Sequence, residues 1–270
     1  MLKVLDLFSG IGGFSLGLER TGGFETVAFC EIEEFPRKVL AKHWPKVTCY
    51  EDVRTLTGER LASDGIAVDV ITGGFPCQDI SVAGKRAGLD GERSGLWSEI
   101  VRLIGDLSPR YVIVENVANL LRGPPERRGG WFGRVLGDLA GCGYDAEWKM
   151  FQGFDAGVPQ SRPRIYVCAI PCGGCERPIL HQNSIYDFSH KTQLDGRSVE
   201  NADAYNKNCR TGSLPILADG TWPKIPDRER SGTHGRLSDG VDRYKGIGNA
   251  VVPQIPEMIG RAILASEQHQ

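Results

Sequence analysis

The sequence predicts an α/β fold in which an open sheet is flanked by helices. Short runs of β-branched residues, such as Val68–Thr72, read as buried strands. Amphipathic patterns, such as Leu96–Leu107, lie between these runs and read as helices. With 270 residues, 40% of them hydrophobic, the chain can bury a full core. Open α/β sheets place ligands at the carboxyl ends of their strands, so we expect the functional groups there.

The first strand, Lys3–Phe8, ends in a glycine turn that includes Gly10, Gly12 and Gly13. A helix from Phe14 to Arg20 follows it. Strand, glycine turn and helix together form a nucleotide-cradling arrangement, because the glycines let the backbone approach the ligand and the helix start offers free N–H groups. The spacing is not G-x-G-x-x-G, which disfavours a nicotinamide dinucleotide.

The next strand, Thr26–Cys30, ends in Glu31, which is placed to accept hydrogen bonds from ribose hydroxyls or is an ordinary surface residue. A helix from Pro36 to His43 comes after it. The segment Glu51–Val53 reads as the end of a third strand, with Asp52 available to the polar edge of a ring.

The Val68–Thr72 strand leads into Gly73-Gly74-Phe75-Pro76-Cys77-Gln78. This places a thiol at a strand end, either as a catalytic group or as a loop cysteine that happens to follow a proline. The polar stretch from Gln78 to Ser94 is long for a compact domain, and its basic residues and glycines suit a lid over an anionic substrate.

The Leu96–Leu107 helix precedes the buried strand Tyr111–Val114, which delivers Glu115. A carboxylate at the end of a buried strand loses solvation, so Glu115 is a candidate acid with a raised pKa, or else it caps the next turn. We expect three further elements: a helix over Trp131–Ala140 and strands over Tyr144–Phe151 and Arg164–Ile170.

The periodic pattern fades between Pro171 and Arg236, and the final helix opens at Gly248–Pro253 and runs to about Ala265. We therefore expect a catalytic domain of residues 1–170 plus 246–270 and a small irregular domain of residues 171–245. Cys172 and Cys175 have metal-ligand spacing, but with no second such pair they read as turn residues, and we expect no metal.

The net charge of −2 argues neither for nor against nucleic acid. The chain shows neither a charged leader followed by an apolar run nor an apolar stretch near 18 residues, so we expect a cytoplasmic protein without a membrane anchor. Its eight cysteines should then be reduced thiols.

Five segments, in this order, resemble the motifs of the DNA (cytosine-5) methyltransferases, and most closely those of the compact bacterial or phage-borne members. They are Asp6–Gly13, Gly73–Gln78, Glu115–Val117, Gln160–Arg164 and Gly248–Pro253. The resemblance implies a Rossmann-like, S-adenosylmethionine-dependent methyltransferase fold with a small target-recognition domain. The Arg-rich segment that often precedes the last motif is poorly marked here, which leaves the target sequence open.

The resemblance also implies the chemistry. The Cys77 thiolate would add to carbon 6 of a flipped cytosine, so that carbon 5 can attack the methyl group of the donor. Glu115 would hold or protonate ring nitrogen 3, while Arg162 and Arg164 would orient the base and balance charge. The group that removes the carbon 5 proton is not named by the sequence. Contacts to DNA would come from Gln78, Ser81, Lys85 and Arg86.

By the same resemblance, the cofactor is S-adenosyl-L-methionine, which leaves as S-adenosyl-L-homocysteine. Its expected contacts are Asp6, Phe8, Ser9, Gly10, Gly12, Glu31, Ile32, Asp52, Val53, Gly73, Pro76, Leu96, Asn249, Ala250 and Val251. Enzymes that methylate an exocyclic amine carry Asn/Asp-Pro-Pro-Tyr/Phe where this chain has Phe75-Pro76-Cys77, so the cysteine favours carbon 5. The expected partner is double-stranded DNA, bound by a monomer that can be paired with a restriction endonuclease.

Three alternatives stay open at this point. A tRNA-methylating branch of the same family carries similar motifs, so the motifs do not separate RNA from DNA. A DNA-binding module without catalysis is disfavoured by the intact set of Cys77, Glu115, Arg162 and Arg164. A nicotinamide oxidoreductase is disfavoured by the glycine spacing.

Overall fold

A computed structural model describes residues 1–75, 95–123, 129–157, 162–173, 179–180 and 250–268. Seven strands form one sheet in the order β3-β2-β1-β4-β5-β7-β6. Their bounds are β1 Leu2–Leu7, β2 Phe24–Cys30, β3 Thr48–Tyr50, β4 Val70–Gly73, β5 Tyr111–Val117, β6 Tyr144–Phe151 and β7 Arg164–Pro171. The first five strands pair in parallel, and β7 pairs antiparallel with both β5 and β6.

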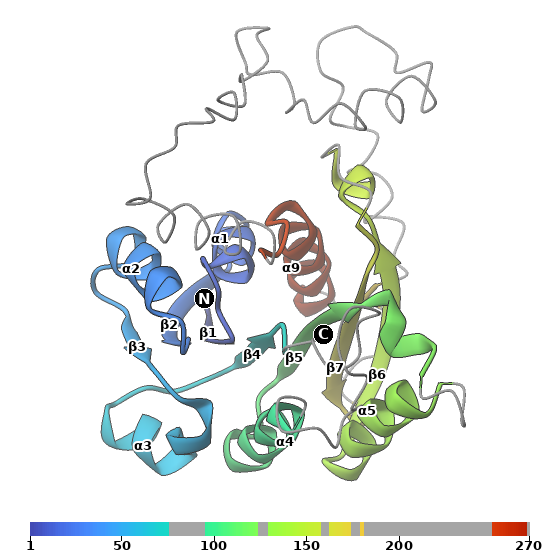
Figure 1. The fold of residues 1–270 in the computed structure, drawn as a ribbon, viewed down its shortest axis with the longest axis horizontal. Coiled ribbons are helices and arrows are strands. Elements are labelled where there is room, and N and C mark those ends of the chain that lie inside the picture. The colour runs from blue at the N-terminus through green and yellow to red at the C-terminus, as the bar shows by residue number, and fades with distance from the viewer. Residues whose placement is uncertain (76–94, 124–128, 158–161, 174–178, 181–249, 269–270) are drawn as a thin grey trace, which may run out of the picture.

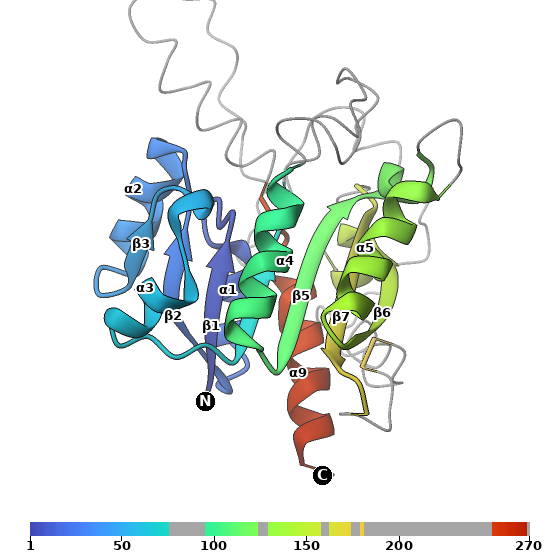
Figure 2. The same ribbon diagram turned by 90° about the horizontal axis from the view of Figure 1, so that it is seen from below.

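Helices cover both faces of this sheet, which gives the three layers of an α/β fold (Figures 1 and 2). Two helices, α1 (Gly13–Glu19) and α9 (Gln254–Glu267), lie on one face. On the opposite face lie α3 (Gly58–Ser63), α4 (Leu96–Leu107) and α5 (Gly130–Gly141). The remaining long helix is α2 (Glu34–His43), and none of the helices in the described ranges is long and apolar enough to cross a membrane.

Strand alternation divides the core into two clusters, one on each face. Leu5 and Leu7 of β1 pack with Ile100 and Leu103 of α4, whereas Val4 packs with residues of α1 and α9. Successive side chains of a strand point to opposite faces, so strands such as β1 and β5 supply both clusters. The expected α/β class is therefore confirmed.

Most element bounds agree with the sequence-based expectations. The α4 helix has the expected bounds, and the first two strands and the helices after them differ by one or two residues. Two differences concern short elements. The expected strand end at Glu51–Val53 was wrong, because β3 ends at Tyr50 and Val53 begins a 3₁₀ helix, η1 (Val53–Thr55), capped by Asp52. The helix α3, of six residues, was not predicted from the sequence.

Helix α1 packs so closely on the segment before α9 that no side chain fits between them. A Cβ atom added to Gly17 would lie 2.1 Å from the carbonyl oxygen of Pro253, and one added to Gly13 would lie 2.4 Å from that of Val251. Backbone therefore packs directly on backbone, and this contact fixes where the segment Val251–Pro253 lies.

We expect Gly17→Ala to lower the free energy of unfolding by about 1–3 kcal/mol, because the added methyl group forces α1 away from the segment before α9. Urea-induced unfolding measures the change. The matched control is Gly105→Ala in α4, where nothing lies within 4 Å of the added Cβ. The control should stabilise the protein by about 0.5–1 kcal/mol through helix propensity. Equal midpoints for both variants would contradict the tight contact.

Candidate active site

The turn after β1 is held in a strained backbone conformation that brings its amides toward the strand ends. Phe8, Gly10 and Gly12 all have positive φ, at 51°, 53° and 85°. Gly12 is fixed by crowding as well, since a Cβ there would lie 2.7 Å from the Trp44 ring. Phe8 is the one residue of the three with a side chain, and backbone of this kind concentrates at functional turns.

Asp6 supports this turn from the buried side. Its side chain is fully buried, and its two carboxylate oxygens accept hydrogen bonds of 2.8 Å from the hydroxyls of Ser15 and Thr72. Burial raises the pKa of Asp6 to about 7, although both hydroxyls oppose the shift. Hydrogen bonds within the protein thus occupy both oxygens of Asp6. Its expected contribution to donor binding stays a prediction, and it would act by holding the turn in place.

Glu31 lies at the end of β2 and closes the other side of the turn. Its Oε2 accepts a hydrogen bond of 2.7 Å from the Gly10 amide, and its Oε1 accepts one of 2.8 Å from the Glu33 amide. Only 8% of the residue is exposed. Each carboxylate oxygen has a second lone pair that no protein group in the described residues takes, which leaves two acceptors for a ligand. Beside it, Ile32 exposes 59% of its surface.

Asp52 lies in the loop after β3, where it caps η1, and its side chain is held by that loop. Its Oδ1 accepts hydrogen bonds from the amide and the Nε of Arg54, each 3.0 Å long. The Arg54 contacts keep the pKa of Asp52 below its usual value, so the group stays ionised. Val53, which follows it, is buried.

Glu115 on β5 forms the second part of the site. Its Oε1 lies 2.8 Å from Nε of Arg164 on β7, and both side chains are mostly buried. Burial raises the pKa of Glu115 to about 7, while the nearby Arg164 and Arg162 guanidinium groups act to lower it. The raised pKa agrees with the expectation from its place at the end of a buried strand.

A pocket lies in front of this pair. Its lining brings together several of the expected residues with some that the sequence analysis did not select: Glu115, Gly153, Arg162, Arg164, Tyr166, Ala250, Val251, Val252 and Ile255. Tyr166 lies opposite Glu115 in the β5–β7 register, so both point to the same face. Tyr166 lies two residues after Arg164 on the same strand, and this spacing could have indicated that both side chains share one face.

The chain before Cys77 approaches the same carboxylate. A Cβ added to Gly74 would lie 3.2 Å from Oε2 of Glu115, so this glycine permits a close approach. The next residue, Phe75, is buried, and its carbonyl accepts a hydrogen bond of 3.2 Å from Nδ2 of Asn116. Asn116 is buried and directly follows Glu115 in the sequence, so its side chain lies on the other face of β5. Consecutive residues of one strand thus hold the backbone and supply the acid.

Seven of the expected site residues lie outside the described residues. They are Cys77, the expected nucleophile, with Pro76, then Gln78, Ser81, Lys85 and Arg86, which are the expected DNA contacts, and Asn249. Most of the small domain expected at residues 171–245 lies outside them too. Within the described ranges, no three His, Cys, Asp or Glu side chains are arranged to hold a metal ion, and the expectation of a metal-free site stays a prediction.

The pKa of Glu115 predicts a falling limb in the pH–rate profile. The protonated carboxyl is the form that can donate to a ring nitrogen, and its population falls as pH rises through about 7. We therefore expect kcat/KM for the nucleic-acid substrate to fall above pH 7, approaching about tenfold per pH unit. Among the described residues, the ionisable side chains that act on this group are Arg164, Arg162 and Tyr166. A profile still rising at pH 9 would contradict protonated Glu115 as the active form.

Known proteins resemble this chain over most of its length. The family model for C-5 cytosine-specific DNA methylases matches residues 2–212. The Type II methyltransferase M.Sau3AI of Staphylococcus aureus is 35% identical over 177 residues, which make up 62% of this chain and 42% of that protein. M1.ScrFI of Lactococcus lactis subsp. cremoris is 34% identical over 256 residues, 94% of this chain and 59% of the relative. The chain thus spans less than two thirds of either relative.

Solved structures agree on the fold. A DNA modification methyltransferase encoded within an Escherichia coli prophage matches with a TM-score of 0.54 and 29% identity, over 63% of this chain and 47% of that one. The Dnmt2 methyltransferase of S. pombe has the same fold, with a TM-score of 0.54 and 23% identity, over 73% of this chain and 56% of that one. Together with the strand-end geometry above, the family match leads to one conclusion: this chain belongs to the C-5 cytosine-specific DNA methylase family.

Proposed function

We propose that this chain transfers a methyl group from S-adenosyl-L-methionine to carbon 5 of a cytosine in double-stranded DNA. The observation that carries the proposal is the buried Glu115–Arg164 pair, which lines a pocket beside the backbone that leads into Cys77. Family membership supports the reaction class, and the Type II methyltransferases among the relatives support a place in restriction and modification.

The glycine turn has groups that fit the methyl donor. The two free acceptor positions of the Glu31 carboxylate match the two hydroxyls of a ribose, and the exposed Ile32 side chain offers an apolar surface to a ring. Asp52, held ionised in the loop after β3, would accept a hydrogen bond from an exocyclic amine. Val251 packs against the turn side of α1 and would close the pocket. The donor supplies an electrophilic methyl group when it is bound.

The protein groups then act on the cytosine ring. The thiolate of Cys77 forms a bond to carbon 6, and Glu115 gives its proton to ring nitrogen 3, which takes up the electron pair displaced by the addition. The ring is then an enamine, and its carbon 5 is the nucleophile that attacks the methyl group. Arg164 balances the charge of the carboxylate that Glu115 becomes, at the 2.8 Å separation already present. After methyl transfer, a base takes the carbon 5 proton, the bond from carbon 6 to sulfur breaks, and the thiolate leaves. The proton on ring nitrogen 3 returns to the Glu115 carboxylate, which restores the starting acid.

The proposal also assigns the domains, the oligomeric state and the location of the protein. Residues 1–170 and 246–270 would form the catalytic unit, and residues 171–245 would read the DNA target in the major groove. The protein would act as a monomer in the cytoplasm, with or without a cognate restriction endonuclease. Gel filtration with light scattering would test the monomer, and two protomers per particle would contradict it.

Base-resolution mapping of 5-methylcytosine tests the function. We expect DNA from a methylation-free bacterial host to become methylated in one fixed short context when the chain is expressed. Side-by-side transfer of labelled methyl groups to duplex DNA and to tRNA separates the proposed reaction from the RNA alternative. Unmodified DNA from a host that contains folded protein able to bind S-adenosylmethionine would contradict the DNA substrate.

A further inference from the structure

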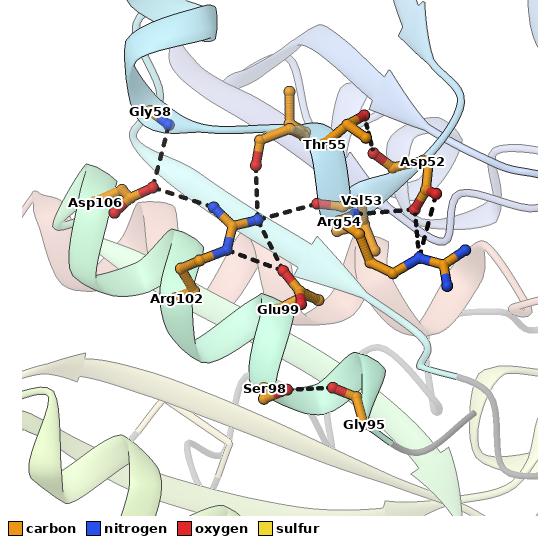
Figure 3. A network of polar contacts seen from close by, with 11 residues as sticks. Asp52, Val53, Arg54, Thr55, Gly58, Gly95, Ser98, Glu99, Arg102 and Asp106 are labelled. Atoms are coloured by element: carbon orange, nitrogen blue, oxygen red, sulfur yellow. Dashed lines mark hydrogen bonds and ion pairs between the residues drawn. The ribbon is translucent and has the colours of Figure 1, made fainter. Parts of the chain in front are cut away.

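Arg102 joins α4 to the loop after β3, and every nitrogen of its guanidinium group takes part in the surrounding network (Figure 3). Its Nη2 donates hydrogen bonds to the carbonyl oxygens of Val53 (3.0 Å) and Leu56 (2.7 Å). Its Nε donates to Glu99 (2.9 Å) and its Nη1 to Asp106 (3.3 Å), both on its own helix. The two carboxylates fix the plane of the guanidinium group, and its Nη2 faces the loop.

The same network continues to the start of α3. Oδ2 of Asp106, which accepts from Arg102, also accepts a hydrogen bond of 3.2 Å from the Gly58 amide. The segment from Val53 to Gly58 is thereby tied to α4 at three backbone positions. By contrast, the polar contacts of Asp52 in Figure 3 are local, because they reach only Arg54 and Thr55.

This loop and the beginning of α4 both carry residues that the proposed function assigns to the donor. Asp52 and Val53 lie at the start of the loop, and Leu96 is the first residue of α4. The distance between these two walls depends on how the loop is held against α4. In addition to the apolar packing of Val53 and Leu56, the Arg102 network sets that distance with directed hydrogen bonds.

We propose that Arg102 is a positioning residue for the methyl donor: it holds the Asp52–Val53 wall at the spacing from Leu96 that the adenine ring requires. The inference rests on the proposed function, because it takes the donor site from it. Arg102 does not line the pocket of Glu115 and Arg164, so its effect should fall on donor binding and leave the chemistry of the base untouched.

The planar fork of arginine is what the network needs. A lysine at this position keeps the positive charge between Glu99 and Asp106, but one ammonium group cannot serve two carboxylates and two carbonyls in this plane. Arg102→Lys therefore loosens the loop with little change in charge. We expect the Kd for S-adenosylmethionine and its KM to rise at least about tenfold, while kcat at saturating donor and the KM for DNA stay within about twofold.

Isothermal titration of the full chain with S-adenosylmethionine makes the test independent of DNA. The matched control is Arg60→Lys, which alters an exposed arginine on α3 that pairs with Asp64 and makes none of the Arg102 contacts. Asp106→Asn weakens only the Gly58 link and one contact to Arg102, and we expect a smaller change in the same direction. All three variants are measured well below their unfolding midpoints, where a purely structural role would leave the Kd unchanged.

The outcomes separate the two proposals. A parent protein that does not bind S-adenosylmethionine would contradict the proposed function. A parent that binds it, together with an Arg102→Lys variant that binds it equally well, would overturn the role of Arg102 alone. An equal loss of affinity in Arg60→Lys would do so as well, because the effect would then not depend on the network.

Discussion

Replacement of Cys77 by serine should abolish methyl transfer, with a loss on the order of 10⁴-fold or more in kcat. A serine hydroxyl is almost entirely protonated near neutral pH, so it cannot add to carbon 6 as a thiolate does. The described chain supports this role up to two residues before the cysteine, because Gly74 passes beside Glu115 and Asn116 holds the carbonyl of Phe75. The measurement is transfer of labelled methyl groups to duplex DNA.

DNA that contains 5-fluorocytosine sharpens this test, because the fluorine blocks the release step and leaves active enzyme covalently bound. The parent should form an adduct that survives denaturing electrophoresis, and the Cys77→Ser variant should not. Cys172→Ser is the matched control, since Cys172 is an exposed free thiol. Full activity or a stable adduct from Cys77→Ser would remove Cys77 as the nucleophile.

Substitution of Glu115 by glutamine is expected to lower kcat by about 10²–10⁴-fold, the usual contribution of a positioned acid. Glutamine keeps the shape of the side chain and can still donate a hydrogen bond to ring nitrogen 3. It cannot transfer a proton, and it leaves Arg164 without its carboxylate partner. The falling limb of the pH–rate profile above pH 7 should disappear in the same variant.

Glu267→Gln provides the control for Glu115→Gln. Glu267 pairs with Arg110 and accepts a hydrogen bond from Tyr111, so a Glu–Arg pair stands at each end of β5. We expect the Glu267 variant to unfold at a lower urea concentration with unchanged kcat. An activity loss of equal size in both variants would mean that the effect of Glu115 is structural.

The sequence patterns were sufficient for most of the elements, apart from the end of β3 and the short helix α3. Apolar runs ending at Leu7, Cys30 and Val114 locate the strands, because burial requires them to be apolar on both faces. An acidic residue directly follows two of these runs, Glu31 after Cys30 and Glu115 after Val114. The raised pKa of Glu115 follows from the same reasoning.

The sequence patterns were not sufficient for contacts that join distant segments. Nothing near Arg102 indicates that its guanidinium group meets the carbonyls of Val53 and Leu56, some 50 positions earlier. The pairing of Glu115 with Arg164 could be expected only from the family resemblance, because it requires β7 to lie antiparallel beside β5. Such contacts depend on the order of strands in the sheet, which local patterns do not specify.

The packing of α9 on α1 has a consequence for how the chain folds. The core on that face combines Val4, Phe14 and Leu18 with Ile259 and Ile263, so residues from the two ends of the described chain complete one cluster. During synthesis, the apolar surface of α1 stays uncovered until α9 has left the ribosome. Contacts so far apart in sequence slow the search for the native state. We therefore expect the sheet and the helices on its two faces to form in one late cooperative step. Fragments that lack α9 should aggregate.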